Sequence, residues 1–132
     1  MIVIAIWCSE LCVKLMLLDN FDLAFKIIQE YRLNPVEIYV HSARAMARQR
    51  QVNRLNDLLK NIKSLVSDDD WDRVLEACIY VFCRELQDMK LAEKFMPLIN
   101  GDANKINAFI IRLESPSPHP PLLFIFHSEQ WG

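Results

Sequence analysis

The stretch Ser67–Leu86, SDDDWDRVLEACIYVFCREL, decides the fold of this chain. Ser67 and the aspartates after it form a helix start signal, because their side chains can accept hydrogen bonds from the free amides of a first turn and favour the positive end of the helix dipole. The pattern predicts a helix from about Asp69 to Leu86. Its apolar positions cover more than half of the circumference, which predicts contact with helices on two sides. These positions are Trp71, Val74, Leu75, Cys78, Ile79, Val81, Phe82 and Leu86.

Amphipathic patterns of the same period precede this central helix. Residues 20–33 carry apolar side chains at helical spacing, and Pro35 both stops that helix and suits the first turn of the next. Residues 35–48 and 52–65 each repeat the stripe, with a short break near Gln49–Gln51. Because a turn this short joins neighbours, we expect the two helices to form an antiparallel hairpin.

Two shorter helices are expected after the central one. The first spans about residues 89–97 and ends near Pro97, and the second spans about residues 103–113 after the turn Asn100–Gly101–Asp102. The chain then changes character at ESPSPHPP, which holds four of the six prolines. Proline at this density cannot continue a helix, so the helical body is expected to end there.

The first 18 residues are mostly apolar, which raises the possibility of a secretory signal or a membrane span. A signal has a basic leading region, which this segment lacks, and a span has ~20 apolar residues without charges such as Glu10 and Lys14. We therefore expect a core helix that is buried against its neighbours, and no direct membrane insertion.

Short amphipathic helices joined by short turns predict an all-α fold of stacked antiparallel helical hairpins, an α-solenoid of the TPR-like kind. A closed helical bundle is the alternative, because one sequence does not fix how hairpins are arranged. No tetratricopeptide consensus recurs at a period of ~34 residues. We expect an α-helical repeat-like domain over residues 1–114 and an irregular, poorly ordered proline-rich tail over residues 115–132.

Composition supports a helical domain. The chain has 132 residues, 52% of them hydrophobic and 24% charged, which excludes wholesale disorder. Fifteen basic and 17 acidic side chains give a formal charge of −2, which supplies no global field for nucleic acid or an anionic membrane. Two glycines are too few for most phosphate-binding loops and for the tight turns of strand-rich folds.

No constellation of residues predicts catalysis, a cofactor or a metal site. Adjacent residues on a helix do not face each other, so His41 and Ser42 do not make a nucleophile with its base. The acidic run Asp68–Asp72 lacks the spacing and the glycine of a calcium loop, and helix capping explains it. The four cysteines, Cys8, Cys12, Cys78 and Cys83, are spaced awkwardly for a zinc site and are expected to be buried, reduced thiols.

The distribution of charge is more informative than its total. Between residues 41 and 64 six basic side chains accompany a single acid, whereas residues 68–76 carry five acids and one arginine. Such polarity between adjacent helices can orient an oppositely charged partner. The candidate partner-binding residues are Arg44, Arg48, Arg54, Asp68, Asp69 and Asp72. A basic nucleic-acid-binding face is an alternative, disfavoured because the aromatic residues lie in the apolar stripes rather than among the arginines.

Several phrases of the sequence resemble a known family. They are AFKIIQEYRL followed by P-x-E-I-Y, the phrase A-x-x-R-Q, LLKNIK, and DDDWD followed by an apolar helix. Together they cover about Asp19–Phe82, and they resemble the C-terminal α-helical region of the spastizin family of large zinc finger FYVE domain proteins, which is linked to hereditary spastic paraplegia. After Phe82 the sequence is expected to depart from the family.

The resemblance implies a non-enzymatic protein-interaction scaffold in endolysosomal trafficking. The family is associated with spatacsin and the fifth adaptor protein complex, with autophagic lysosome reformation, and with the midbody in cytokinesis. By resemblance the chain is expected in the cytoplasm, on endosomes or lysosomes, or at the midbody, with protein partners and without a small-molecule substrate, nucleic acid or cofactor. A generic α-helical adaptor of another multiprotein complex is the alternative.

Overall fold

The computed structural model describes residues 2–115. Its helices are α1 (Ile2–Leu17), α2 (Phe21–Glu30), α3 (Pro35–Arg48), α4 (Val52–Ile62), α5 (Asp68–Tyr80), α6 (Met89–Phe95) and α7 (Asp102–Glu114). A π-helical turn, η1 (Val81–Glu85), continues α5, and a 3₁₀ turn, η2 (Met96–Leu98), continues α6. The predicted all-α class is confirmed, and α5 with η1 covers the predicted central helix. The tail that we expect to be poorly ordered is residues 115–132, and all of it except Ser115 lies outside the described residues.

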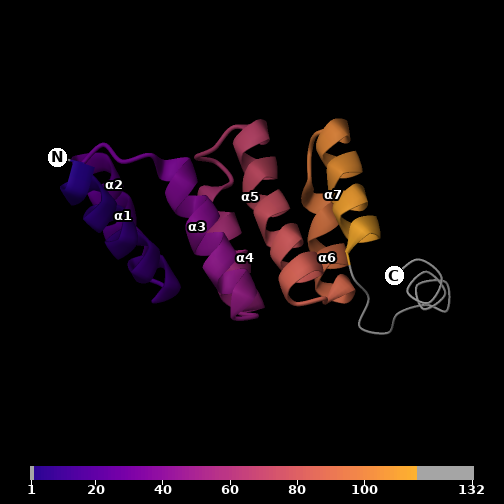
Figure 1. Cartoon of the computed structure of the whole chain (residues 1–132). Helices are drawn as coiled ribbons and strands as arrows, with labels where there is room; N and C mark the ends of the chain where they lie inside the picture. The colour runs from indigo at the N-terminus through magenta and orange to yellow at the C-terminus, as the bar shows by residue number, and fades with distance from the viewer. Residues whose placement is uncertain (1, 116–132) are drawn as a thin grey trace.

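The helices stack as antiparallel pairs. Helices α1, α3, α5 and α7 lie side by side in one row, and each of them contacts the next. Helix α2 packs on α1, α4 on α3, and α6 on α5. Figure 1 shows α1 and α7 at opposite ends of the row, so the stack is open and the alternative of a closed bundle is not observed.

Three helices begin with the side-chain caps that their sequences favour. The side chains of Asn34, Ser67 and Asp88 accept hydrogen bonds from backbone amides three residues further on. These bonds satisfy amides that have no partner within the helix. Ser67 therefore performs the capping role that the sequence predicts for the start of α5.

Four helical segments end in a left-handed residue that is not glycine. These residues, with positive φ angles, are Asp19, Arg32, Arg50 and Gln87. The amide after each of them bonds to a carbonyl five or six residues earlier, as from Asn20 to Leu15 at 2.8 Å. This is the hydrogen-bonding pattern of a Schellman-type end. Because non-glycine residues take up the left-handed conformation, a chain with two glycines can still make tight turns between helices.

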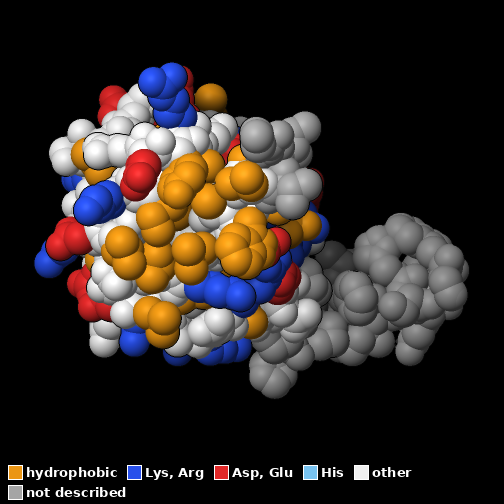
Figure 2. Space-filling view, turned by 90° about the vertical axis from the view of Figure 1, so that its left-hand side faces the viewer, with side chains coloured by type: hydrophobic (Ala, Val, Ile, Leu, Met, Phe, Trp, Pro, Cys, Tyr) orange, Lys and Arg blue, Asp and Glu red, His pale blue; other side chains and the backbone are white. Residues whose placement is uncertain are grey.

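Helix α1 departs from the expectation of a helix buried against its neighbours. Cys8, Cys12 and Met16 face the core, whereas a stripe on another side is exposed, with Trp7 at 74% of its maximal accessible area. Figure 2 looks at this end of the row and shows a broad patch of apolar side chains. Among the helices that the structure describes, none is long and apolar enough to cross a lipid bilayer.

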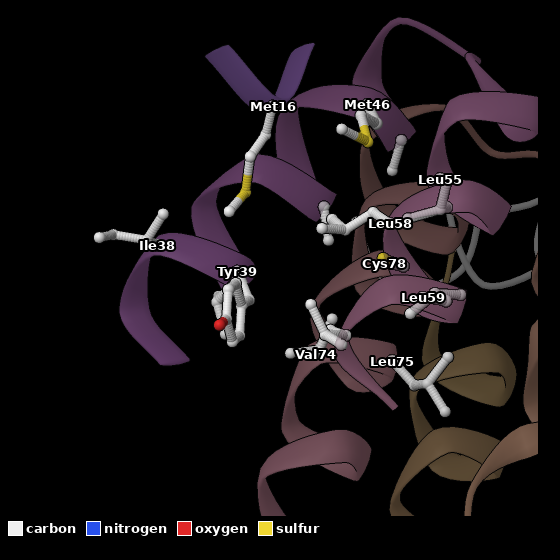
Figure 3. Packing of buried hydrophobic residues seen from close by; sticks show 14 of the residues in the cluster. Met16, Ile38, Tyr39, Met46, Leu55, Leu58, Leu59, Val74, Leu75 and Cys78 are labelled. Carbon is white, nitrogen blue, oxygen red and sulfur yellow. The ribbon is translucent and has the colours of Figure 1, made fainter. Parts of the chain in front are cut away.

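The core runs through the whole stack along the joints between helices. Met46 of α3, Leu55 and Leu58 of α4, and Leu75 of α5 are fully buried. Figure 3 shows Leu55 and Leu58 side by side, with Val74 and Leu75 of α5 further along the core. Phe82 of η1 stacks on Phe95 of α6 with ring centroids 5.4 Å apart. Helix α5 contacts α3, α6 and α7, so the predicted central position of this helix is confirmed.

All four cysteines are buried free thiols, in agreement with the sequence prediction. The Cys12 thiol faces the carbonyl oxygen of Ala24 across the α1–α2 joint at 3.7 Å. Burial raises the pKa of the Cys78 thiol to about 12. A thiol with such a pKa stays protonated at neutral pH, so Cys78 behaves as a small apolar core side chain.

Candidate protein-docking face

Two adjoining hollows lie along the row of helices. The larger one, of about 920 Å³, lies between α1 and α3 and is closed at one end by the turn between α2 and α3. Its walls are mainly apolar and include Ile6, Val13, Tyr31, Leu33 and Ile38. Charged side chains of α1 and α3 stand among them, so an occupant would be held by apolar contact and oriented by a few charges.

The smaller hollow, of about 550 Å³, lies between α3 and α5 and has a different chemistry. Three arginines and three glutamates line it, together with His41, Tyr80 and a few apolar side chains. The charged residues are Arg44, Arg48, Arg73, Glu37, Glu76 and Glu85. A hollow of this composition can exchange ion pairs with a partner rather than bury an apolar side chain.

Ion pairs join the helices around the smaller hollow. Arg73 of α5 pairs with Glu37 of α3. Arg48 of α3 donates two hydrogen bonds to Glu85 of η1, from Nε to Oε1 at 2.8 Å and from Nη2 to Oε2 at 3.1 Å. The bond from Arg48 lowers the pKa of Glu85 below its ordinary value. These glutamates are therefore already paired, and Arg44 has no hydrogen bond or ion pair within the part of the chain that the structure describes.

Glu76 completes the ionic wall from α5. Burial, with a smaller contribution from the nearby charge of Asp72, raises its pKa above the ordinary value. A partly buried carboxylate of this kind gains from a cationic neighbour, because an opposite charge offsets the cost of desolvation. Glu76 and Arg44 thus give the hollow one acid and one base that a partner can address.

The two hollows share Glu37 and His41, both on α3. Residues one turn apart on a helix lie on the same side, so α3 forms a ridge between the two depressions. A single extended partner lying across this ridge would meet an apolar section beside α1 and an ionic section beside α5. We call the combined surface the docking face; it comprises the two hollows and the α3 ridge between them.

The structure brings some of the predicted partner-binding residues together. Arg44 and Arg48 both line the smaller hollow. Arg54 does not, because it lies on α4 and its Nη1 donates to the backbone carbonyl oxygen of Leu17. That bond links the end of α1 to α4.

The predicted acidic residues lie elsewhere. Asp68 and Asp69 are exposed in the first turn of α5, and Asp68 Oδ1 accepts a hydrogen bond from Asn100 at 3.4 Å. Neither of them lines a hollow. The acidic end of α5 faces the turn before α7, so the predicted basic and acidic groups do not form one surface.

Asp72 corrects a sequence expectation, because its side chain is 1% exposed and cannot be part of a surface. Its carboxylate accepts hydrogen bonds from the amides of Asn100 at 2.7 Å and Gly101 at 2.8 Å and from the side chain of Asn104 at 2.9 Å. Burial raises the pKa of Asp72, but these bonds and the charge of Lys105 outweigh burial and lower the pKa below its ordinary value. Asp72 therefore holds the start of α7 onto α5.

Sequence reasoning missed the apolar hollow. Its walls include residues of α1 together with Tyr31 and Leu33 at the end of α2, where the sequence pattern predicts only helix packing. A signal was present in α1, where apolar residues occur all round the helix rather than in one stripe. A helix of that kind needs neighbours on every side, and the described part of the chain supplies them on one side only.

The residues that could suggest catalysis or metal binding are not arranged for it. Ser42 is buried, and its hydroxyl donates to the sulfur of Met16 at 3.4 Å, whereas His41 is exposed at the ridge. Among residues 2–115 no three His, Cys, Asp or Glu side chains converge as a metal site.

The open stack of antiparallel pairs with a hollowed row defines an α-helical repeat segment. A comparison with protein families makes the assignment specific. The chain belongs to the family described as "ZFYVE26-like, TPR repeats", whose model matches residues 34–113. The match continues well past Phe82, so the expectation that the sequence departs from the family there is wrong. Repeat segments of this type are typically non-catalytic.

Similar proteins are much longer than this chain. A protein of Dictyostelium discoideum is 33% identical over 103 residues, which is 78% of the chain. Zinc finger FYVE domain-containing protein 26 is 28% identical in Bos taurus over 94 residues and 27% identical in Homo sapiens over 95, in each case 70% of the chain. The chain spans about 4% of the length of each of these relatives. No solved structure gives a significant match.

Proposed function

We propose that this chain is a protein-interaction segment that binds a partner on the docking face. The observation that carries the proposal is the adjoining pair of hollows, apolar between α1 and α3 and ionic between α3 and α5, with one shared ridge. Helices that pack on one another form the walls of both hollows, so the face exists in the chain without a partner. Preformed surfaces of this kind bind at a smaller ordering cost.

The shape and chemistry of the face favour a peptide or helix with two distinct sections. An apolar section would bury side chains against Ile6 and Val13, and a charged section would pair with Arg44 and Glu76. Burial of apolar area supplies most of the binding free energy in such contacts, and charge fixes the direction of the partner. The pairing of Arg48 with Glu85 makes Arg48 a weaker candidate than Arg44.

The resemblance to the spastizin family supports a particular setting for this activity. We propose that the chain acts as part of a scaffold in endolysosomal trafficking, in autophagic lysosome reformation or in cytokinesis. Its partners would be spatacsin or the fifth adaptor protein complex, and its location the cytoplasm, on endosomes or lysosomes or at the midbody. These are roles of much longer proteins, of which the chain covers a small part. The test therefore measures binding by this chain alone.

The test measures binding of the full chain to purified spatacsin and to the purified adaptor complex by biolayer interferometry. Ile6→Asp introduces a charge into the apolar hollow, and Arg44→Glu reverses a charge in the ionic one. Ile6 is more than half exposed, so its replacement spares the core. We expect each variant to weaken binding at least about tenfold, a loss of ~1.4 kcal/mol.

Matched controls carry the same changes away from the docking face. Leu65→Asp introduces a charge at an exposed apolar position after α4, and Lys60→Glu reverses an exposed charge on α4. Both controls should bind like the unmodified chain. Binding that is unchanged in the hollow variants, or lost equally in the controls, would show that the docking face is not the interface.

A further inference from the structure

The chain leaves its last helix at the margin of the docking face. Helix α7 ends at Glu114, and Ser115 has extended backbone angles, φ −81° and ψ 143°, as a residue before proline favours. The Ser115 hydroxyl donates a hydrogen bond to the backbone carbonyl oxygen of Ile111, one turn earlier. Ile111 lines the smaller hollow. The chain therefore continues from a point beside that hollow.

The sequence after Ser115 has two parts of different composition. Residues 116–121, PSPHPP, contain four prolines, and residues 122–126, LLFIF, are all large and apolar. We call the first part the proline spacer and the second the apolar segment. Proline-rich sequences favour the extended polyproline conformation with a rise of about 3.1 Å per residue, so the seven steps from Ser115 to Leu122 correspond to ~22 Å.

The apolar hollow lies at a similar distance from α7. Helices α7, α5, α3 and α1 follow one another along the row (Figure 1), and the apolar hollow lies between the last two. Packed helices have axes about 8–10 Å apart, so two and a half helix spacings correspond to about 20–25 Å. The proline spacer thus has the length that brings the apolar segment to this hollow.

The walls of the apolar hollow match the apolar segment in chemistry. Ile6 and Tyr31 are each more than half exposed and offer apolar area to an occupant. The charged side chains of the walls, such as Lys14 and Arg32, are exposed and can stay hydrated. The apolar segment has no charged residue, so it would bring no unpaired charge into the hollow. Burial would also remove a run of apolar residues that promotes aggregation when it is exposed to water.

We propose that the apolar segment occupies the apolar hollow of its own chain and competes there with a partner of the docking face. The competition rests on the proposed function, whereas the seating of the segment does not. A short tether holds a segment near its site at an effective concentration of order mM, so weak contacts are enough to fill the hollow. The proposal replaces the expectation of poor order for these five residues.

The first experiment measures the accessibility of the hollow in the full chain. Ser9 lines the apolar hollow and is partly buried, so Ser9→Cys introduces a thiol there. The native thiols are buried, and the introduced one should react first with iodoacetamide. Adding Phe124→Asp, which charges the apolar segment, should raise the alkylation rate about tenfold, as expected if the segment fills the hollow in about nine of ten molecules.

Two controls test the position and the reach of the apolar segment. Ser64→Cys introduces a thiol at an exposed site after α4, where Phe124→Asp should not change the alkylation rate. Deleting residues 116–119 keeps the apolar segment but shortens the spacer by ~12 Å. The thiol at position 9 should then react as fast as in the Phe124→Asp chain. Circular dichroism should show the same helix content in every variant.

The second experiment measures competition, by biolayer interferometry with the two purified proteins of the docking test. Phe124→Asp should strengthen binding about tenfold, because it frees the hollow in most molecules. Adding Ile6→Asp should abolish that gain.

The outcomes separate the two parts of the proposal. An alkylation rate that Phe124→Asp or the deletion leaves unchanged would overturn the seating, and protection that increases with protein concentration would place the segment of one copy in the hollow of another. Faster alkylation without stronger binding would overturn the competition alone. If neither protein binds any variant, the proposed function and the competition fail together, and the alkylation rates still decide the seating.

Discussion

Helices α1 and α5 both carry apolar side chains on more than one side, but their surroundings differ. Helix α5 is bordered by α3 on one side and by α6 and α7 on the other, and most of its apolar positions are fully buried. Helix α1 packs on α2 and α3 and leaves an apolar stripe exposed. The comparison teaches that an apolar pattern predicts how many neighbours a helix needs, and that it does not say whether the same chain provides them.

The largest expected effect is on the free energy of unfolding, and it should be much greater for a substitution at the centre of the stack than for one in the exposed stripe of α1. Phe82→Ala removes a fully buried ring that stacks on Phe95, and we expect it to lower the free energy of unfolding by about 3–5 kcal/mol. Leu11→Ala, in the exposed stripe of α1, should change it by about 0.5 kcal/mol or less. Urea unfolding followed by circular dichroism at low protein concentration measures both.

The same two variants can also contradict the difference in burial between α1 and the centre of the stack. Losses of similar size would show that the stripe on α1 is buried in the folded chain, either by another copy or by a segment outside the described residues. Repeating the Leu11→Ala measurement at several protein concentrations distinguishes these cases, since a contact between copies depends on concentration and an internal contact does not.

The sequence predicts the positions of the helices better than it predicts their surroundings. The helices were predictable because local patterns and caps determine where helices form. The useful signals were the apolar spacing, the cap at Ser67 and the stop at Pro35. The π-helical turn at Val81–Glu85 was not predicted, since its apolar spacing resembles that of an ordinary helix. The predicted stack of antiparallel hairpins is confirmed. The sequence left a closed bundle as the alternative, because the arrangement of hairpins depends on packing between distant residues.

A second prediction concerns Asp72, which joins α5 to the start of α7. Asp72→Asn should lower the free energy of unfolding by about 2 kcal/mol, because a neutral amide cannot accept at both oxygens from the two backbone amides and from Asn104. The Asp72 pKa is lower in the folded chain than its ordinary value of 3.8. Its contribution is therefore present above that pH and is lost as the pH falls through the folded pKa.

Unfolding measured against pH tests this assignment. The difference in stability between the unmodified chain and Asp72→Asn should be constant near neutrality and should narrow below about pH 4. Asp69→Asn serves as the matched control, because this carboxylate is exposed and makes no hydrogen bond in the described structure. A difference that does not depend on pH would show that Asp72 acts through packing alone.

The candidate site was predictable to a smaller degree than the fold. Charge polarity along the sequence identified Arg44 and Arg48, which do share a hollow. It also suggested Asp72, since a buried carboxylate and an exposed one look alike in a sequence, and only the three-dimensional position of the turn at Asn100–Gly101 distinguishes them. The apolar hollow was missed because its walls come from segments far apart in the chain.

The smallest effect is expected for the ion pair between Arg48 and Glu85. Both side chains are more than a third exposed, so a double-mutant cycle with Arg48→Ala and Glu85→Ala should give a coupling free energy below about 1 kcal/mol, decreasing with salt. Burial at α5 would then hold the centre of the stack together, and Arg48 would be free to exchange Glu85 for an acidic group of a partner. A coupling above about 2 kcal/mol, measured by urea unfolding, would instead make the pair a structural clamp between α3 and η1. Arg48 would then not be available to a partner, and Arg44 would be the remaining arginine of α3 in the docking face.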